Sequence, residues 1–424
     1  MNSIEVFNEV TWLETEEETN DENRAPFDEN VCHSTPLSSF SAKRAPVFRS
    51  AALTSPLADL SQSFMEVRKR LQPTDFFWSQ VTPGAIRFKR RRTDDDASRN
   101  GLLNMPNEVV DHIMSFLNKR DLMNFGAVSQ RFYQLASHQK HWLVVNMVGK
   151  NVLDSALHRI VSRKTSVLAM MSTHIEYDVA LLTRDFPPCH LVKLDVTSAK
   201  FPDIEALNSL LRRCRNLEYL SLQHQIVNYE TLELISRNPD LKVLNLSNCG
   251  DLSPKGLTLI FRCCSLVEFN MSWCDNYEEL APVLLNELPS TIKCLAIAGF
   301  REYDDKAMSS IIERLPELQE LDVSDNHQIT AAFITKLKVS APNLLKLTIP
   351  RCFRIEPVAF CLLKNLEVLN IQGLLDLEGY RFLKSELPET IINQSIFQTI
   401  AKSQVSNDPD EHPSFWGEDI DEPY

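Results

Sequence analysis

Four side chains suited to protein recognition lie at regular intervals in the second half of the sequence. Trp273, Asp325 and Arg351 occupy equivalent positions of a sequence repeat, and Arg301 lies in the repeat between Trp273 and Asp325. A rigid aromatic ring beside an acid and guanidinium groups is typical of a binding hot spot, where the ring anchors a partner and the charges orient it. We expect these four residues to form one patch that binds a protein. An ordinary solvated rim is the alternative interpretation.

The sequence contains none of the common catalytic motifs that we looked for. We find no GxSxG, no P-loop and no HExxH pattern, and the histidines are scattered. No CxxC pair is present, so Cys249, Cys274 and Cys352 are expected to be structural residues and not metal or redox sites. The sequence therefore predicts a protein that is not an enzyme, with no catalytic residue, no metal and no cofactor.

Composition and charge narrow the class of partner. The 424 residues carry a net charge of −13, so a general nucleic-acid binder, which needs a broad basic face, is not expected. The sequence shows neither a secretory leader nor an apolar run of about 18 residues, so no membrane partner is expected. The ten cysteines lack the spacing of a disulfide framework, and we interpret them as reduced thiols in the nucleus and cytoplasm.

A repeat carries the four recognition residues. The pattern LxxLxLxx(N/C) occurs at Leu241, Leu244, Leu246 and Cys249. The first positions of successive copies advance by 26, 24, 25, 26, 26, 26 and 22 residues, which is typical of a leucine-rich repeat with one short strand and one helix per turn. About eight such repeats are predicted over residues 186–392. The copies begin at Leu191, Leu217, Leu241, Leu266, Ile292, Leu318, Leu344 and Leu366.

The periodicity also predicts how the repeats pack. Helical patterns such as Ile204 to Leu211 lie between the strands and would cover their back. Because no single repeat buries its own apolar face, the repeats should stack into one α/β solenoid with a concave wall of strands. Strand alternation should point Leu244 and Leu321 into the core and polar side chains onto the wall. The expected wall residues are Tyr219, Ser221, Gln223, Asn245, Ser247, Glu268, Asn270, Ser272, Glu320, Asp322, Ser324, Lys346 and Thr348.

A different pattern precedes the repeats, over residues 101–146. Pro106 falls in the first turn of a predicted helix, and apolar residues then recur at helical spacing. Asp121 can cap a second helix, and a third begins near Gln130. Three helices of this length make a small core, so the unit should depend on a partner or on the next domain. The face expected to bind a partner consists of Met105, Pro106, Val109, Val110, Ile113, Phe116 and Leu117.

The amino-terminal part of the chain shows neither the leucine-rich repeat nor the helical spacing of apolar residues. Residues 1–100 are acidic at first and then rich in Ser, Thr and Pro, which predicts disorder. Lys89, Arg90, Arg91 and Arg92 are typical of a nuclear import signal, although a solvated charge run would have the same composition.

Two further segments complete the predicted organisation. Residues 147–185 are expected to form a helical linker and repeat cap, and residues 393–424 an acidic tail. Phe415 and Trp416 stand among acidic residues of that tail and could anchor it inside the arc of repeats. A plain disordered acidic tail is the alternative.

Residues 101–146 resemble an F-box. The matching residues are Met105 to Val110, Ile113, Ala127 to Ala136 and Trp142, with Phe132 at a position where the family often has tryptophan. Together with the cysteine-type repeats, they resemble the F-box/leucine-rich-repeat substrate receptors of SCF ubiquitin ligases. The resemblance implies that the first helices bind the SCF adaptor, and through it a cullin, while the repeats hold a substrate.

Several repeat segments are similar to one branch of that family, including Phe269 to Cys274, Gly299 to Arg301 and Arg351 to Phe353. This resemblance implies that a phosphorylated cyclin-dependent-kinase inhibitor is targeted for degradation, which would promote the cell cycle. It also implies that a small phosphate-binding accessory subunit of these kinases sits on the concave face, and that the tail folds back along that face. The residues implied to hold the subunit are Trp273, Arg301, Asp325 and Arg351.

Two alternatives to this function stay open. One is an SCF receptor for an unrelated substrate. The other is a non-ligase scaffold or GTPase-activating arc, in which Arg351 or Arg301 would act in trans on a nucleotide.

Overall fold

The computed structural model describes residues 101–176, 188–395, 399–403, 414–416 and 418–419. All of these residues belong to one compact unit. The predicted disordered region 1–100, including Lys89, Arg90, Arg91 and Arg92, lies outside the described residues. Across the described ranges, no helix has the length and apolar character needed to cross a membrane.

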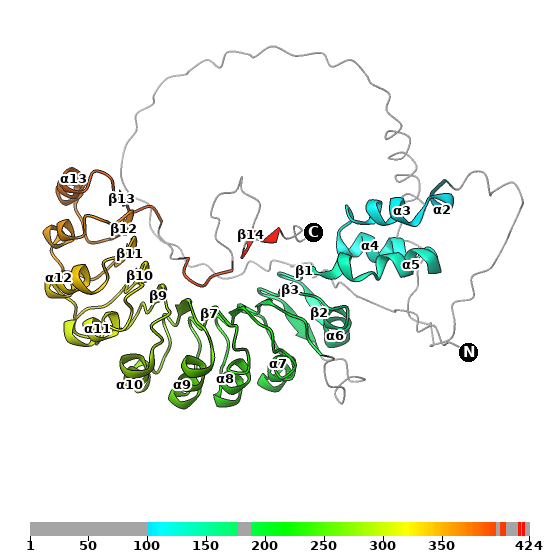
Figure 1. The fold of residues 1–424 in the computed structure, drawn as a ribbon, viewed down its shortest axis with the longest axis horizontal. Helices are drawn as coiled ribbons and strands as arrows, with labels where there is room; N and C mark the ends of the chain where they lie inside the picture. The colour runs from blue at the N-terminus through cyan, green and yellow to red at the C-terminus, as the bar shows by residue number, and fades with distance from the viewer. Residues whose placement is uncertain (1–100, 177–187, 396–398, 404–413, 417, 420–424) are drawn as a thin grey trace, which may run out of the picture. The chain divides into compact units, whose positions relative to one another are not determined.

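In the described part of the chain, eleven short strands form one parallel sheet (Figure 1). The central residues of adjacent strands, such as Leu220, Leu244 and Phe269, are paired in register. This order is what a stack of strand–helix repeats requires. A separate parallel pair consists of β2 (Asn151–Leu153) and β4 (His174–Glu176). The strands of the large sheet are β1 (Val144–Asn146), β3 (Val167–Ala169), β5 (Lys193–Asp195), β6 (Tyr219–Ser221), β7 (Val243–Asn245), β8 (Glu268–Asn270), β9 (Cys294–Ala296), β10 (Glu320–Asp322), β11 (Lys346–Thr348), β12 (Val368–Asn370) and β13 (Ile391–Ile392).

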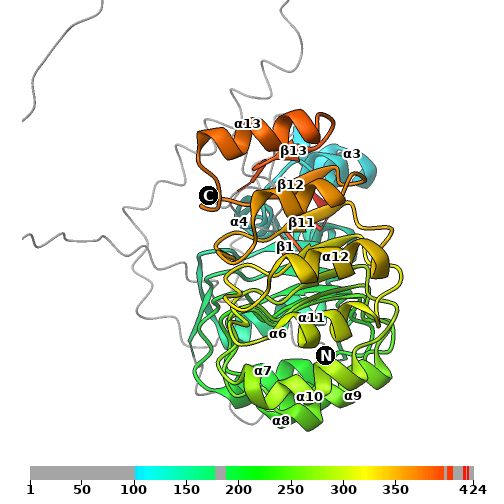
Figure 2. The same cartoon turned by 90° about the vertical axis from the view of Figure 1, so that its left-hand side faces the viewer.

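Helices cover the outer side of this sheet, as Figure 1 shows and Figure 2 shows from the C-terminal end of the repeats. Polar residues in the preceding turns cap most of them; the Asp203 carboxylate, for example, accepts a hydrogen bond from the Ala206 N–H at 2.8 Å. The predicted α/β solenoid is confirmed. The helices are α6 (Asp154–Ser162), α7 (Ile204–Leu211), α8 (Tyr229–Ile235), α9 (Pro254–Cys263), α10 (Tyr277–Glu287), α11 (Asp305–Ile312), α12 (Ala331–Ser340), the 3-10 helix η4 (Pro357–Leu362) and α13 (Leu377–Glu386).

Buried cysteines tie neighbouring repeats together. The thiols of Cys249, Cys274 and Cys352 donate to backbone carbonyl groups of the preceding repeat at 3.1, 3.2 and 3.4 Å. Burial raises the pKa of the Cys274 and Cys352 thiols to about 12, so both stay neutral donors. The expected structural role of these cysteines is confirmed.

The repeats begin earlier than the sequence pattern indicated. The described part of 147–185, expected to form a helical linker and repeat cap, contains β3 of the large sheet and the separate pair β2 and β4 as well as α6. The repeat of Leu168 was missed because Thr165 replaces its first leucine and Thr173 replaces its asparagine or cysteine. The Thr173 hydroxyl still donates to the Met147 carbonyl at 2.7 Å, the bond that cysteine thiols make in later repeats. With β1, β3 and β13, the sheet has eleven strands where about eight repeats were expected.

Four short helices and a 3-10 turn precede the sheet. The second predicted helix is capped by Asn118, whose side chain accepts from the Asp121 N–H at 2.8 Å, and not by Asp121 as expected. Asp121 lies instead in the first turn, where its negative charge interacts favourably with the positive end of the helix dipole. The elements are α2 (Gly101–Asn104), α3 (Asn107–Met114), α4 (Lys119–Gly126), α5 (Gln130–Ala136) and the 3-10 helix η3 (Gln139–Trp142).

Trp142 joins these helices to the first repeat. Its Nε1 donates to the Ala136 carbonyl at 2.8 Å, and the guanidinium of Arg163, which follows α6, lies 3.9 Å from the centre of its ring. One apolar core runs from Val110 in α3 to Ile392 in β13. The small helical unit therefore depends on the repeats for much of its burial, as its size predicted.

Candidate functional site

One turn position after the strands holds residues with a positive φ angle. Left-handed backbone is costly for large side chains, and glycine or asparagine relieves this cost. Tryptophan, aspartate and arginine nevertheless occupy three of these turns, and such strained positions cluster at binding sites. The residues at this position, with φ between 52° and 83°, are Gly149, Ser172, Ser198, His224, Asn248, Trp273, Gly299, Asp325, Arg351 and Gly373.

The Trp273 ring packs against the turn of the next repeat. A Cβ added to Gly299 would lie 2.7 Å from the ring, so only glycine leaves room for it at this turn, where φ is also +83°. The guanidinium carbon of Arg301 lies 5.9 Å from the centre of the ring, a cation–π contact. Trp273 is still 38% exposed, so a preoriented aromatic surface is available to a partner.

Arg351 and Asp325 form a two-bond ion pair on the following turns. The Arg351 Nε donates to Asp325 Oδ1 at 2.5 Å, and Nη2 donates to Oδ2. This bond raises the pKa of the Arg351 guanidinium. Asp325 is 6% exposed, whereas the Arg351 side chain is 52% exposed. Asp325 therefore fixes the guanidinium, and the exposed side of Arg351 can contact an anionic group.

Backbone hydrogen bonds place these turns side by side. The N–H groups of Trp273, Gly299 and Asp325 donate to carbonyl groups one repeat further along, at 2.9, 2.9 and 3.0 Å. Trp273, Arg301, Asp325 and Arg351 thus lie on adjacent turns along one edge of the sheet, and we call these four residues the edge patch. That the edge patch binds a protein stays a prediction.

The polar wall of the sheet is less open than expected. Ser221, Asn245 and Asn270 are at most 1% exposed. The segment 399–403 crosses this wall on the inner side of the sheet (Figure 1), and the Asn270 amide donates to the Ile400 carbonyl at 3.0 Å. The wall residues therefore hold the chain's own carboxyl-terminal segment, a role that alternation along the strands does not predict.

The structure places both aromatic residues of the tail on the same face. Phe415 is 0% exposed and packs with Val167 and Ala169 of β3. The centre of the Trp416 ring lies 5.5 Å from that of the Tyr219 ring. The backbone carbonyl of Trp416 accepts a hydrogen bond from the Lys193 amino group of β5 at 2.8 Å. The described residues of the tail are thus seated on the wall, where a short hairpin forms between β14 (Ser414–Phe415) and β15 (Glu418–Asp419).

Buried carboxylates face this segment. Asp195 and Asp322 are 0% and 2% exposed, and loss of water raises the pKa of both, that of Asp322 to about 6. Burial also raises the pKa of Glu268, which accepts from the Ala401 N–H at 3.1 Å. Asp195 accepts a hydrogen bond from the Ser403 hydroxyl. Acidic groups on the wall therefore accept hydrogen bonds from the tail.

The face expected to bind an adaptor is partly exposed. On α3, Val109 is 44% exposed, and Phe116, just after the helix, is 76% exposed. Val110 is 0% exposed and packs in the core, so its expected contact with a partner is wrong: helical spacing identified the apolar stripe but not which edge of it faces inward. The prediction missed Val128, which is 54% exposed. Pro106 is also exposed, while Met105, Ile113 and Leu117 are half-buried.

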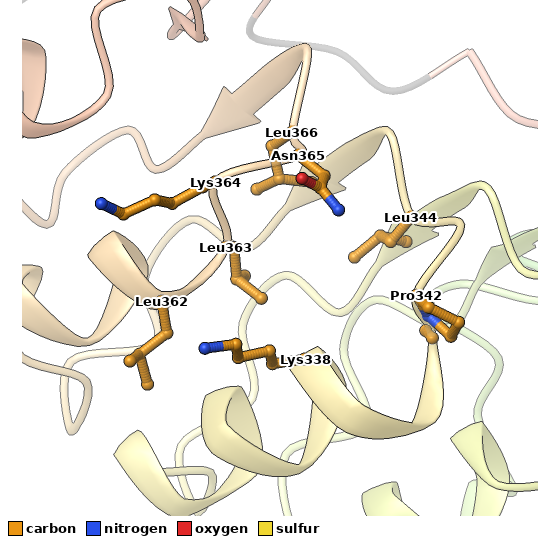
Figure 3. Close-up of a pocket in the computed structure, with 9 residues that line it drawn as sticks. Lys338, Pro342, Leu344, Leu362, Leu363, Lys364, Asn365 and Leu366 are labelled. Atoms are coloured by element: carbon orange, nitrogen blue, oxygen red, sulfur yellow. The ribbon is translucent and has the colours of Figure 1, made fainter.

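A cavity of about 250 Å³ lies between the end of α12 and the loop after η4 (Figure 3). Leucine side chains form much of its wall, and its charged groups are Lys338 and Lys364. No carboxylate, histidine, cysteine or hydroxyl side chain is among its lining residues.

Comparisons with known families agree with this architecture. Residues 155–421 match the SKP2 LRR domain family, and residues 102–144 match the F-box domain. F-box/LRR-repeat protein 25 of Arabidopsis thaliana is 26% identical over 218 residues, which cover 46% of this chain and 75% of that protein. BTB/POZ domain-containing protein FBL11 of the same plant is 29% identical over 179 residues, which cover 32% of this chain and only 19% of that longer protein.

Among solved structures, a chain of the yeast Rad7 and Elc1 complex has a TM-score of 0.38 and 15% identity, with 80% of this chain and 93% of that chain covered. The family match over residues 155–421 spans more than half of the chain and contains the edge patch and the tail. The chain is an F-box protein that belongs to the family of the SKP2 leucine-rich-repeat domain.

Proposed function

We propose that this protein is the substrate-recognition subunit of an SCF ubiquitin ligase. The observation that carries the proposal is an F-box with exposed apolar side chains, built on the same core as a repeat sheet that has a preoriented recognition patch. The F-box would bind an Skp1-type adaptor and, through it, a cullin. The repeats would hold the protein to be ubiquitinated.

The adaptor side of the proposal rests on the exposed residues near α3. Val109 and Phe116 are large apolar side chains that the chain itself leaves in contact with water. The Phe116 ring is held by an edge contact with His112, at 5.0 Å between ring centres. An exposed apolar cluster on a small helical unit is typical of an interaction site.

The connection between the two parts supports a positioning role. The shared core and the Arg163 contact with Trp142 hold the F-box and the first repeats together without a long linker. A receptor of this kind makes no bonds itself. It raises the effective concentration of a substrate lysine near the ubiquitin-loaded partner.

For the substrate side, we propose that the edge patch holds a phosphorylated protein, directly or through a cyclin-dependent-kinase accessory subunit. Exposed Trp273 supplies the apolar anchor, and the Arg301 and Arg351 guanidinium groups supply the positive charge that an anionic partner needs. A cyclin-dependent-kinase inhibitor as substrate, and a role in cell-cycle progression, are the finer form of this proposal.

The same contacts favour a receptor over a GTPase-activating arc. An arginine that acts in trans on a nucleotide must reach out from its own protein. The ion pair with Asp325 holds the Arg351 guanidinium against its own turn, so it can contact a group docked on the sheet edge but does not extend away from the protein. We further propose that the protein acts in the nucleus and cytoplasm, which fusion of Lys89 to Arg92 to a fluorescent reporter would test.

The adaptor interface is tested by Val109→Asp combined with Phe116→Asp. Charge placed in a desolvated contact is expected to weaken binding by about 2 kcal/mol or more, roughly thirtyfold or greater, so adaptor and cullin should no longer co-purify. Val339→Asp is the matched control, because Val339 is 73% exposed on α12. Adaptor recovery equal to wild type from the double variant would refute the interface.

The substrate patch is tested by Trp273→Ala and Arg351→Glu in the adaptor-bound protein. Each should lower binding of phosphorylated substrate from dividing cells by roughly tenfold or more, and phosphatase treatment should do the same to wild type. Adaptor binding should not change. If both variants capture the substrate as wild type does, the edge patch is not the binding site and the receptor uses another surface.

A further inference from the structure

Ser403 is the point at which the tail contacts a buried acid. Its hydroxyl donates to Asp195 Oδ2, and the other Asp195 oxygen accepts from the Thr197 N–H at 2.7 Å. Ser403 is 4% exposed, and its Oγ also lies 3.6 Å from the Met171 sulfur. The hydroxyl therefore fits a closed site whose polar partner is a carboxylate.

A phosphate on Ser403 could not occupy this site. It would bring about two negative charges and three bulky oxygens against the Asp195 carboxylate, in a position without open space. Lys193, on the same strand as Asp195, already donates to the Trp416 carbonyl at 2.8 Å, and its amino group lies 5.0 Å from the centre of the Tyr219 ring. Pairing it with the phosphate would remove a contact that seats the tail.

The seated tail also has features that favour its release. Ala401 and Trp416 have φ angles of +57° and +46°, a backbone conformation that is costly for residues other than glycine. The Trp416 Nε1 is buried without a hydrogen-bond partner among the described residues. The strained backbone and an indole N–H left unpaired within the described ranges lower the free-energy cost of releasing the segment, so an open state can be populated transiently.

We propose that Ser403 is a phosphorylation site and that its phosphorylation displaces the tail from the concave wall by repulsion from Asp195. A protein kinase would act on the transiently open segment and transfer the γ-phosphoryl group of ATP to Ser403 Oγ. The new O–P bond replaces the bond to the leaving ADP, and the hydroxyl proton goes to the kinase base. The phosphate then prevents the segment from reseating.

Displacement would change the character of the wall. Val167 and Ala169 lie beneath Phe415, and Val243 and Ala296 pack with Ile400 and Ala401. Once the tail leaves, these apolar strand residues and the Asn270 amide are exposed to solvent. This inference rests on the tail contacts and does not depend on the proposed ligase function.

The test uses the full chain with phosphoserine incorporated at position 403 and measures amide hydrogen exchange. The Ala401 N–H reports directly on the contact with the wall, because it donates to Glu268 when the tail is seated, and the Trp416 N–H reports on the seated fold of the tail, because it donates to the Ser403 carbonyl. Phosphorylation should speed their exchange by about tenfold or more. Asp195→Asn should reduce this acceleration, because it removes the like charge while keeping the shape.

Phosphoserine at Ser385, an exposed residue of α13, is the matched control and should leave tail exchange unchanged. Ser403→Ala removes the hydrogen bond without adding charge and should speed exchange less than the phosphate does. Unchanged exchange in the chain phosphorylated at Ser403, or equal acceleration with Asp195→Asn, would overturn the mechanism. Phosphopeptide mapping of the chain from cells should find modified Ser403; complete recovery of only the unmodified peptide would overturn the site.

Discussion

The F-box helices and the repeat strands use apolar side chains in opposite ways. In the repeats, the central strand residues Leu244 and Leu321 are 0% and 1% exposed. In the F-box, Val109, Phe116 and Val128 are 44%, 76% and 54% exposed. A stack of repeats supplies every strand with an apolar neighbour, whereas a unit of four short helices has more apolar surface than it can bury.

Polar side chains show a second contrast between the repeats and the F-box. The concave wall buries carboxylates and amides, such as Asp195 and Asn270, because the tail covers them and supplies hydrogen-bond partners. The F-box leaves its apolar residues for another chain to cover. Exposed apolar side chains in the F-box therefore indicate a binding partner. Buried polar side chains on the concave wall indicate that a segment of the same chain, the tail, binds there.

The largest expected effect is on the repeat core. Leu321→Ala should lower the free energy of unfolding by about 2–5 kcal/mol, because a fully packed position leaves a cavity when truncated. Urea unfolding of the full chain measures the change. A midpoint equal to that of wild type would mean that the strand residues are not the shared core on which the comparison depends.

The next effect is a pH dependence of the wall. The Asp322 pKa is raised from about 3.9 to about 6, so the folded state favours its neutral form. Its contribution to stability is complete below the unfolded pKa and is lost as the pH rises through about 6. Between pH 4 and pH 7.5 we expect a loss of about 2 kcal/mol. Asp322→Asn should flatten this part of the urea-midpoint profile, and matching profiles would contradict the assignment.

A smaller effect is expected at the turn beneath the tryptophan. Gly299→Ala should cost about 1–2 kcal/mol, because its φ of +83° disfavours a side chain and the new Cβ would collide with the Trp273 ring. The change in Trp273 fluorescence, compared with a Trp273→Phe background, measures the ring's displacement. Unaltered fluorescence with full stability would show that the ring does not depend on this turn.

The smallest expected effect sharpens the contrast between the two regions. Val109→Asp alone should change the free energy of unfolding by less than about 0.5 kcal/mol, since nearly half of the residue is already exposed to water in the isolated chain. Thermal unfolding without adaptor measures this. A large loss of stability would mean that Val109 is part of the F-box core, and the loss of adaptor binding by its variants would then need another explanation.

Particular residues show where sequence reasoning succeeded. The repeats from Leu191 to Leu366 were recognised because a leucine-rich period survives substitution at single positions. The repeat of Leu168 was missed because Thr165 and Thr173 interrupt the consensus, although Thr173 makes the expected backbone bond. Val110 was misplaced because helical spacing defines a stripe and only packing decides its inner edge.

The sequence by itself determined the strand–helix repeat, the F-box helices and the positions at which recognition residues recur, because these depend on local periodicity. The tertiary structure decided which contacts form between distant segments. The Asp325–Arg351 pair joins residues 26 positions apart, and the Ser403–Asp195 bond joins residues 208 apart. The repeat period predicts that the turns of Asp325 and Arg351 are neighbours, but it does not predict that their side chains pair. No local period encodes the Ser403–Asp195 bond, which forms because the curved wall leaves polar groups for the tail to satisfy.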